Sequence, residues 1–107
     1  MNDSVDVLRS AAQQFCSLTE AMLAAAQQGS WDDFLAQHVL REQQMTVLLG
    51  QDKALLIQLL PALRASLQQA LEHSRRLDQL VRARRDELGE ILSSGQRARR
   101  LRSTYTR

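Results

Sequence analysis

Residues 53–92 read KALLIQLLPALRASLQQALEHSRRLDQLVRARRDELGEIL. Apolar side chains recur through this stretch in steps of three and four residues, which is the period of one face of an α-helix. Further leucines beside those positions widen the face to the breadth expected of a helix in a globular bundle. The stretch therefore predicts one long amphipathic helix over about 53–92, with Asp52 as its N-terminal cap.

Pro61 is the one local conflict inside this predicted helix. Proline removes a backbone donor and disfavours helical geometry at Leu60. Because proline fits best at the first position of a helix, we expect a break or a kink near Pro61. From Pro61 to Ile91 the helix would be ~45 Å long at 1.5 Å per residue.

Two shorter helices are expected before the long one. Residues 4–28 carry apolar residues in steps of three and four and end at Gly29, which can adopt the positive φ that follows a last turn. Ser30 is the predicted hydroxyl cap of a helix over about 30–49, with two aspartates in its first turn. The short connection makes the pair an antiparallel hairpin. The second helix reaches only ~30 Å, so part of the long helix is expected to extend past the hairpin or to be covered otherwise.

The C-terminal end is expected to form a separate element. Residues 93–95, Ser-Ser-Gly, predict a stop, and residues 96–105 then carry a thin apolar stripe among arginines. A helix this short is not stable alone in water. We therefore expect it to fold back, to fray or to dock on a partner, with Arg97 and Leu101 as candidate contact residues.

Arg84 occupies a position of the long helix where the apolar spacing would place a leucine. One interpretation is that its stem packs while its guanidinium reaches water and pairs with Asp86 or Glu87. The other is that no helix of this chain covers the position, so that Arg84 lies against a partner. Both interpretations remain open from the sequence.

Composition agrees with an all-α chain. Only four glycines and one proline occur among 107 residues, too few for the turns of a sandwich or barrel. We predict an antiparallel three- to four-helix bundle with a helical hairpin, one long helix and a short C-terminal amphipathic segment, in one helical domain over 1–107. The lone Cys16 rules out an internal disulfide and is expected to be half-buried, and no signal peptide or membrane-length apolar run is present. A cytoplasmic protein is expected, without membrane insertion.

Charge is unevenly distributed along the chain. Residues 1–74 carry four basic and eight acidic side chains, whereas residues 75–107 carry ten arginines and four acidic side chains. A basic end suggests an acidic partner or nucleic acid, although an arginine-rich end also complements its own helix dipole. Direct nucleic-acid binding is not expected, because Tyr105 is the only aromatic residue beyond Phe34 that could stack on bases.

Catalytic motifs are missing from the sequence. It has no glycine-rich phosphate loop, no paired-cysteine metal motif and no nucleophile elbow. His38 and Glu42 are one turn apart, which is half of a metal site on a helix, but the apolar stripes offer no further inward carboxylates. We therefore expect no enzymatic activity, no cofactor and no metal.

Three landmarks occur in a recognisable order: Gly29-Ser30-Trp31-Asp32 after an alanine-rich first helix, Leu60-Pro61-Ala62-Leu63-Arg64, and Leu77-x-x-Leu80-x-x-x-Arg84-x-Asp86-Glu87-Leu88 followed by Leu101 and Tyr105. In order and spacing the chain resembles the FliT-type flagellar export chaperones over nearly its whole length.

This resemblance implies a cytoplasmic chaperone that binds the C-terminal region of the filament-cap protein, prevents its premature assembly and delivers it to the type III export apparatus. The family's substrate-binding apolar face would fall on Leu63, Leu67 and Leu71. The terminal tyrosine implicated in contacts with the export ATPase complex and the export-gate protein would fall on Tyr105. A flagellar transcription regulator is a further partner of some members.

Other functions stay open from the sequence. The chain could serve a different secretion substrate, such as a hook–filament junction protein. It could also be a self-associating bundle whose apolar stripe is a homodimer seam, or a regulator-binding protein. The chain ends soon after the tyrosine, whereas enterobacterial members continue and use that tail for regulation.

Overall fold

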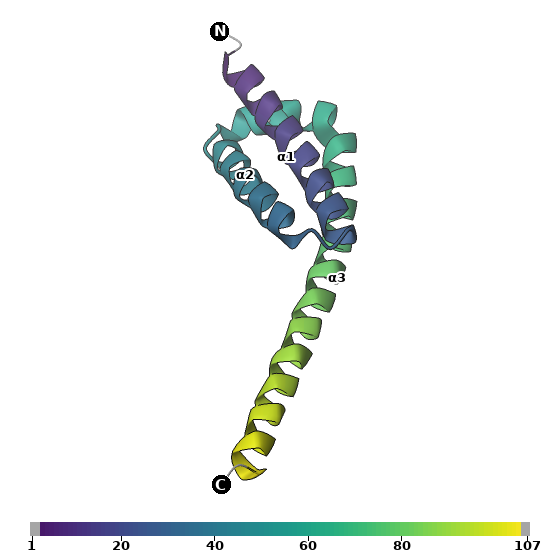
Figure 1. The fold of residues 1–107 in the computed structure, drawn as a ribbon. Coiled ribbons are helices and arrows are strands. Elements are labelled where there is room, and N and C mark those ends of the chain that lie inside the picture. Colours follow the sequence, from purple (N-terminus) through teal and green to yellow (C-terminus); the bar gives the residue numbers. More distant parts are fainter. Residues whose placement is uncertain (1–2, 106–107) are drawn as a thin grey trace. The chain divides into compact units, whose positions relative to one another are not determined.

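The computed structural model describes residues 3–105, with side chains up to Arg102, as three helices. These are α1 (Asp3–Gln27), α2 (Trp31–Leu49) and α3 (Lys53–Tyr105) (Figure 1). No strand occurs in that range, so the prediction of an all-α fold is confirmed. The two bounds of α1 and of α2, and the start of α3, lie within one residue of the expected positions.

The chain divides into two units, Met1–Leu77 and Asp78–Arg107. The first unit holds α1, α2 and the first part of α3, and the second holds the remainder of α3. The single domain over 1–107 stays a prediction.

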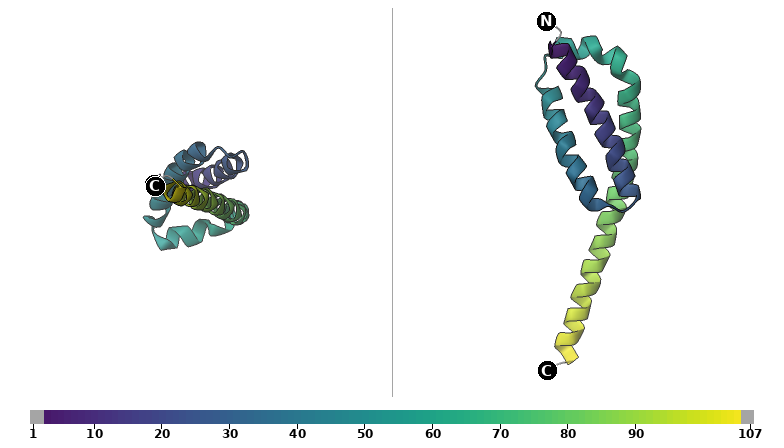
Figure 2. Two further views of the ribbon diagram at one scale, coloured as in Figure 1. Left: turned by 60° about the horizontal axis from the view of Figure 1, so that its bottom comes forward. Right: turned by 45° about the horizontal axis from the view of Figure 1, so that its top comes forward.

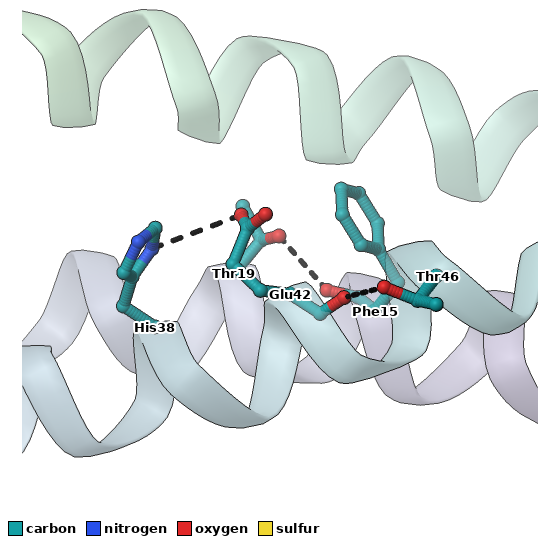
Figure 3. Close-up of polar contacts among 5 residues, drawn as sticks. All are labelled: Phe15, Thr19, His38, Glu42 and Thr46. Atoms are coloured by element: carbon teal, nitrogen blue, oxygen red, sulfur yellow. Dashed lines mark hydrogen bonds and ion pairs between the residues drawn. The ribbon is translucent and has the colours of Figure 1, made fainter. Parts of the chain in front are cut away.

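Most of the core of the first unit comes from α1. Eight of its side chains are buried, and those of Leu8, Thr19 and Met22 are almost completely enclosed. The Thr19 hydroxyl donates to the carbonyl oxygen of Phe15 at 2.8 Å, which satisfies the one buried polar side chain of the described residues (Figure 3). From α3, the core receives Leu59, Ala70 and Leu77, whereas no side chain of α2 is buried.

The link between α1 and α2 follows from Gly29, whose φ is 73°. The Gly29 amide donates to the Ala26 carbonyl at 3.1 Å and the Ser30 amide donates to the Ala25 carbonyl at 2.9 Å. This pair of bonds is the Schellman motif, which requires a left-handed residue that glycine adopts without steric penalty. The predicted stop at Gly29 is confirmed.

The expected side-chain cap at Ser30 is wrong, because its hydroxyl makes no capping hydrogen bond. The backbone at Ser30 has φ −84° and ψ 71°, outside the extended geometry that directs an N-cap hydroxyl toward the next amides. The predicted N-terminal cap of α3 at Asp52 is confirmed, since the Ala54 amide donates to Asp52 Oδ1 at 3.1 Å.

Pro61 lies inside α3 without breaking it. Figure 1 shows α3 changing direction in its teal part, near residue 60 on the colour scale, and Figure 2 shows the same bend from another side. Proline causes such a bend because its ring displaces the preceding carbonyl and its nitrogen donates no hydrogen bond. Of the two expected outcomes, the structure has the kink.

The predicted stop at 93–95 is wrong. α3 runs through Ser93, Ser94 and Gly95 to Tyr105, and Gly29 is the only residue of 3–105 with a positive φ. Serine and glycine inside a helix cost at most about 1 kcal/mol each relative to alanine, and the residues that follow favour helix strongly. Residues 96–105 are thus the end of α3 rather than a separate segment.

Candidate functional site

Side chains of α1 and α3 line a shallow pocket of about 370 Å³ in the first unit. Leu63, Ser66 and Leu67 contribute from α3, and α1 contributes Ala12, Gln13, Cys16 and Ser17. Small side chains on both helices leave this space open, while the two leucines make one wall apolar. We call it the α1–α3 groove.

Two of the three leucines expected to bind a partner line the α1–α3 groove. Leu63 and Leu67 are half-buried in the groove, one helical turn apart. Leu71 follows one turn later and does not line the pocket, but its side chain is 52 % exposed. The groove and Leu71 together present apolar surface that this chain does not cover.

Cys16 lies in the lining of the α1–α3 groove. Its thiol donates to the Ser66 carbonyl oxygen at 3.6 Å, joining residues fifty positions apart in the sequence. Burial raises the pKa of the Cys16 thiol, because a low-dielectric surrounding disfavours the thiolate. The thiol is half-buried, as the sequence predicts, and it is predominantly protonated at neutral pH.

A stack of rings follows the inward side of α2. The Trp31 and Phe34 rings meet in a T-shaped arrangement with centroids 5.3 Å apart, and the His38 ring lies parallel to Phe34 at 6.4 Å. Farther along, the Arg41 guanidinium lies 5.6 Å from the centroid of the Phe15 ring on α1. Of these contacts, the one between Arg41 and Phe15 joins α2 to α1, and no side chain of α2 is buried.

His38 lies one helical turn before Glu42 on α2. Its Nδ1 atom lies 3.9 Å from Glu42 Oε1, as Figure 3 shows, and the Glu42 carbonyl accepts a hydrogen bond from the Thr46 hydroxyl at 3.0 Å. No group of three or more His, Cys, Asp or Glu side chains suited to a metal occurs in the part of the chain that the structure describes.

The remaining candidate residues lie in the second unit. Arg84 is half-buried and pairs with Glu87, Nη1 to Oε2 at 3.3 Å, as one of the two interpretations expects. Arg97 and Leu101 are exposed on the last turns of α3. Tyr105 is the last residue of α3, and its side chain lies outside the described residues. These candidate residues thus lie on α3, as Leu63, Leu67 and Leu71 do, but they belong to the second unit.

A family model described as Flagellar protein FliT matches residues 9–107. The chain belongs to the FliT family. The match spans nearly the whole chain, including the groove residues and all of α2 and α3. FliT proteins are flagellar export chaperones, and the resemblance found in the sequence is confirmed at that level. No curated protein and no solved structure matches the chain.

Membership of the FliT family gives the exposed leucines a functional context. A chaperone of this kind has to present apolar surface to another chain, and both units of this FliT protein carry such surface. None of the helices within residues 3–105 is long and apolar enough to cross a membrane.

Sequence reasoning missed the α1 side of the groove. It expected Cys16 to be half-buried but did not pair it with Ser66, and it gave Ser17 no role. A sequence signal for this side is present, because small side chains recur on one face of α1 and allow another helix to pack closely against it. Which α3 residues oppose them depends on the direction that α3 takes after Pro61, and local sequence does not specify this direction.

Proposed function

We propose that this chain is a cytoplasmic export chaperone that binds the C-terminal region of the filament-cap protein, prevents its premature assembly and delivers it to the type III export apparatus. In this proposal the chain acts as one helical domain, built on an antiparallel bundle of α1, α2 and the first part of α3. No catalytic step is involved.

The observation that carries the proposal is the α1–α3 groove with its apolar wall of Leu63 and Leu67. An amphipathic helix binds such a groove through apolar side chains spaced three and four residues apart. Burying one leucine side chain fully contributes roughly 1.5–3 kcal/mol. Leu71, exposed one turn beyond the groove, extends the surface for a client of two or more turns.

Delivery requires a second set of contacts, with the export ATPase complex and the export-gate protein. We assign these to the end of α3, where Arg97, Leu101 and Tyr105 are the candidate residues. Binding to a flagellar transcription regulator is an additional possibility that the FliT family offers, and no residue is assigned to it here.

The test is a binding titration of the full chain with the C-terminal region of the filament-cap protein. Leu67→Asp places a charge in the groove and should weaken binding by about 100-fold, the loss expected at a central apolar contact. The matched control is Ile57→Asp, because Ile57 is an apolar α3 residue that is 70 % exposed and does not line the groove. That variant should bind as the unchanged chain does.

Protection of Cys16 provides a second measurement that needs no substitution. A client seated in the groove covers the only thiol of the chain and should slow its reaction with a maleimide reagent. Equal binding by the Leu67 and Ile57 variants, or unchanged Cys16 reactivity with client bound, would contradict the proposal. Binding of a hook–filament junction protein instead of the cap protein would reassign the substrate.

A further inference from the structure

The lining of the α1–α3 groove carries no charged side chain. On α1, residues 10–19 include the whole α1 side of the lining and contain no acidic or basic residue. On α3, Arg64 is the only charged residue of 54–71, the stretch that holds Leu63 and Leu67. The charges that a bound helix would meet therefore lie at the ends of the groove rather than along it.

The direction of the two helices decides which charges share an end. Residues 62–77 of α3 run beside α1 in the same direction, as Figures 1 and 2 both show. The hydrogen bond from the Cys16 thiol to the Ser66 carbonyl aligns the two helices near the middle of the groove. Leu63 therefore lies toward the start of α1, and Leu67 lies toward its end.

The end of the groove nearer the start of α1 is positive. Arg9 precedes Gln13 by one turn on α1, and Arg64 directly follows Leu63 on α3. Both arginines are exposed, and neither has an ion pair or a side-chain hydrogen bond with any residue that the structure describes. Asp6 lies one turn farther from the lining, in the first turn of α1, where a carboxylate offsets the helix dipole. One guanidinium on each helix thus remains for a carboxylate of a bound chain.

The opposite end of the groove is negative. Glu20 follows Ser17 by three residues, is exposed and has no ion pair with any described residue. The last turn of α1 contains no basic residue that would offset its terminal carbonyl groups. Arg75 and Arg76 follow on α3, but both are exposed and lie about 100° or more round the helix axis from the buried Leu77. Glu20 is therefore the charge that a client meets at this end.

We propose that the client helix of this groove carries an acidic side chain at one end of its apolar stripe and a basic side chain at the other. The proposal rests on the proposed function, because it takes the groove to be the client site. The acid pairs with Arg9 and Arg64, and the base pairs with Glu20. Arg9 and Glu20 are about 16 Å apart along α1, so the two client charges lie about three turns apart. These charges fix the direction in which the client lies, which apolar contacts alone leave open.

The test uses three fluorescent peptides of about 18 residues, each with leucines in steps of three and four. The first carries a glutamate at one end of the leucine stripe and a lysine about three turns away, the second carries two glutamates there, and the third carries two lysines. In fluorescence anisotropy with the full chain at low salt, the mixed peptide should bind about 3- to 10-fold more tightly than the others, as expected for a few exposed ion pairs. The difference should disappear at high salt.

Charge-reversal variants locate the preference on the groove. Glu20→Lys makes all three charged positions basic, so the peptide with two glutamates should then bind most tightly. The matched control is Glu90→Lys, which makes the same change in net charge at an exposed helical glutamate of the second unit and should keep the preference for the mixed peptide. Arg9→Glu combined with Arg64→Glu should shift the preference to the peptide with two lysines.

Equal affinities of the three peptides would overturn the proposal, and so would equal shifts of preference in Glu20→Lys and Glu90→Lys, which would reflect net charge alone. Failure of all three peptides to bind while the cap-protein region binds would also overturn it. Cap-protein binding that is lost in Leu67→Asp but unchanged in Glu20→Lys would remove only the charge pattern and leave the proposed function standing. Cap-protein binding that is insensitive to Leu67→Asp would remove the proposed function and this proposal with it.

Discussion

The two units of the chain place similar residues in opposite surroundings. In the first unit, α1 buries eight side chains, among them Leu8 and Met22. In the second, no side chain of residues 78–102 is buried, although leucine and isoleucine recur there at helical spacing. An amphipathic pattern therefore indicates a helix but not what covers it. Tertiary packing stabilises the first unit, whereas the second relies on helix propensity and local side-chain pairs.

The largest effect should come from removing a core side chain of the first unit. Leu8→Ala should lower the free energy of unfolding by about 2–5 kcal/mol, because the Leu8 side chain is fully enclosed and its loss leaves a cavity. Leu92→Ala in the second unit should change it by less than about 0.5 kcal/mol. Urea titrations followed by the fluorescence of Trp31, the only tryptophan, give both values. Equal losses of unfolding free energy for the two variants would contradict the difference in burial between the two units.

An intermediate effect is expected for thiol reactivity. Burial raises the pKa of Cys16, so a smaller fraction is thiolate at a given pH. The thiol introduced by Ser94→Cys in a Cys16→Ser background lies at an exposed position and should react with a disulfide reagent about 10-fold faster near pH 8.

The pH dependence of the two thiols sharpens this comparison. The rate for Cys16 should continue to rise at pH values where the rate for the introduced thiol has levelled off. Because the folded-state pKa of Cys16 is raised, the stability linked to its protonated form is present below the ordinary thiol pKa and lost as pH rises above it. Superimposable rate profiles would show that Cys16 is as accessible as a residue of the second unit.

The smallest effect should come from the local ion pair of the second unit. Glu87→Gln removes the charge partner of Arg84 at an exposed helical site, where such pairs contribute about 0.3 kcal/mol. Hydrogen exchange should quicken slightly for amides near residue 87 and not in α1. Raising the salt concentration should abolish the difference. A large loss of protection throughout α3 would instead mean that this pair controls helix formation.

The sequence predicts most of the fold because the signals for helix ends are local. Gly29 is followed by a serine and two aspartates that favour a new helix, and Asp52 caps α3 through a carboxylate two residues before the amide that it binds. Gly95 is not followed by residues that favour a new helix, because Gln96 and the arginines after it favour continuation of the same helix. The stop predicted there relied on Ser-Ser-Gly alone, whereas the glycines that do end α1 and α2 are each followed closely by residues that start a new helix.

The candidate site is only half predictable from sequence for a related reason. Leu63 and Leu67 belong to a periodic stripe, so their common face follows from spacing alone. Ala12 and Cys16, which lie opposite them in the groove, come from a helix some fifty residues earlier, and no local pattern indicates that these residues of α1 and α3 lie close together. Arg41 shows the same dependence, since its position over the Phe15 ring results from how α1 and α2 pack.

The buried alanines of α1 set a limit on how this protein can vary. Ala11, Ala25 and Ala26 are all nearly inaccessible, so a larger residue at any of them has to push the neighbouring helices apart. Drift at these positions is restricted to the smallest side chains, whereas packing within the chain sets no such limit on the exposed positions of residues 78–102. Divergent members of such a lineage should therefore retain the alanine pattern of their first helix longer than the identity of the surfaces with which they recognise other proteins.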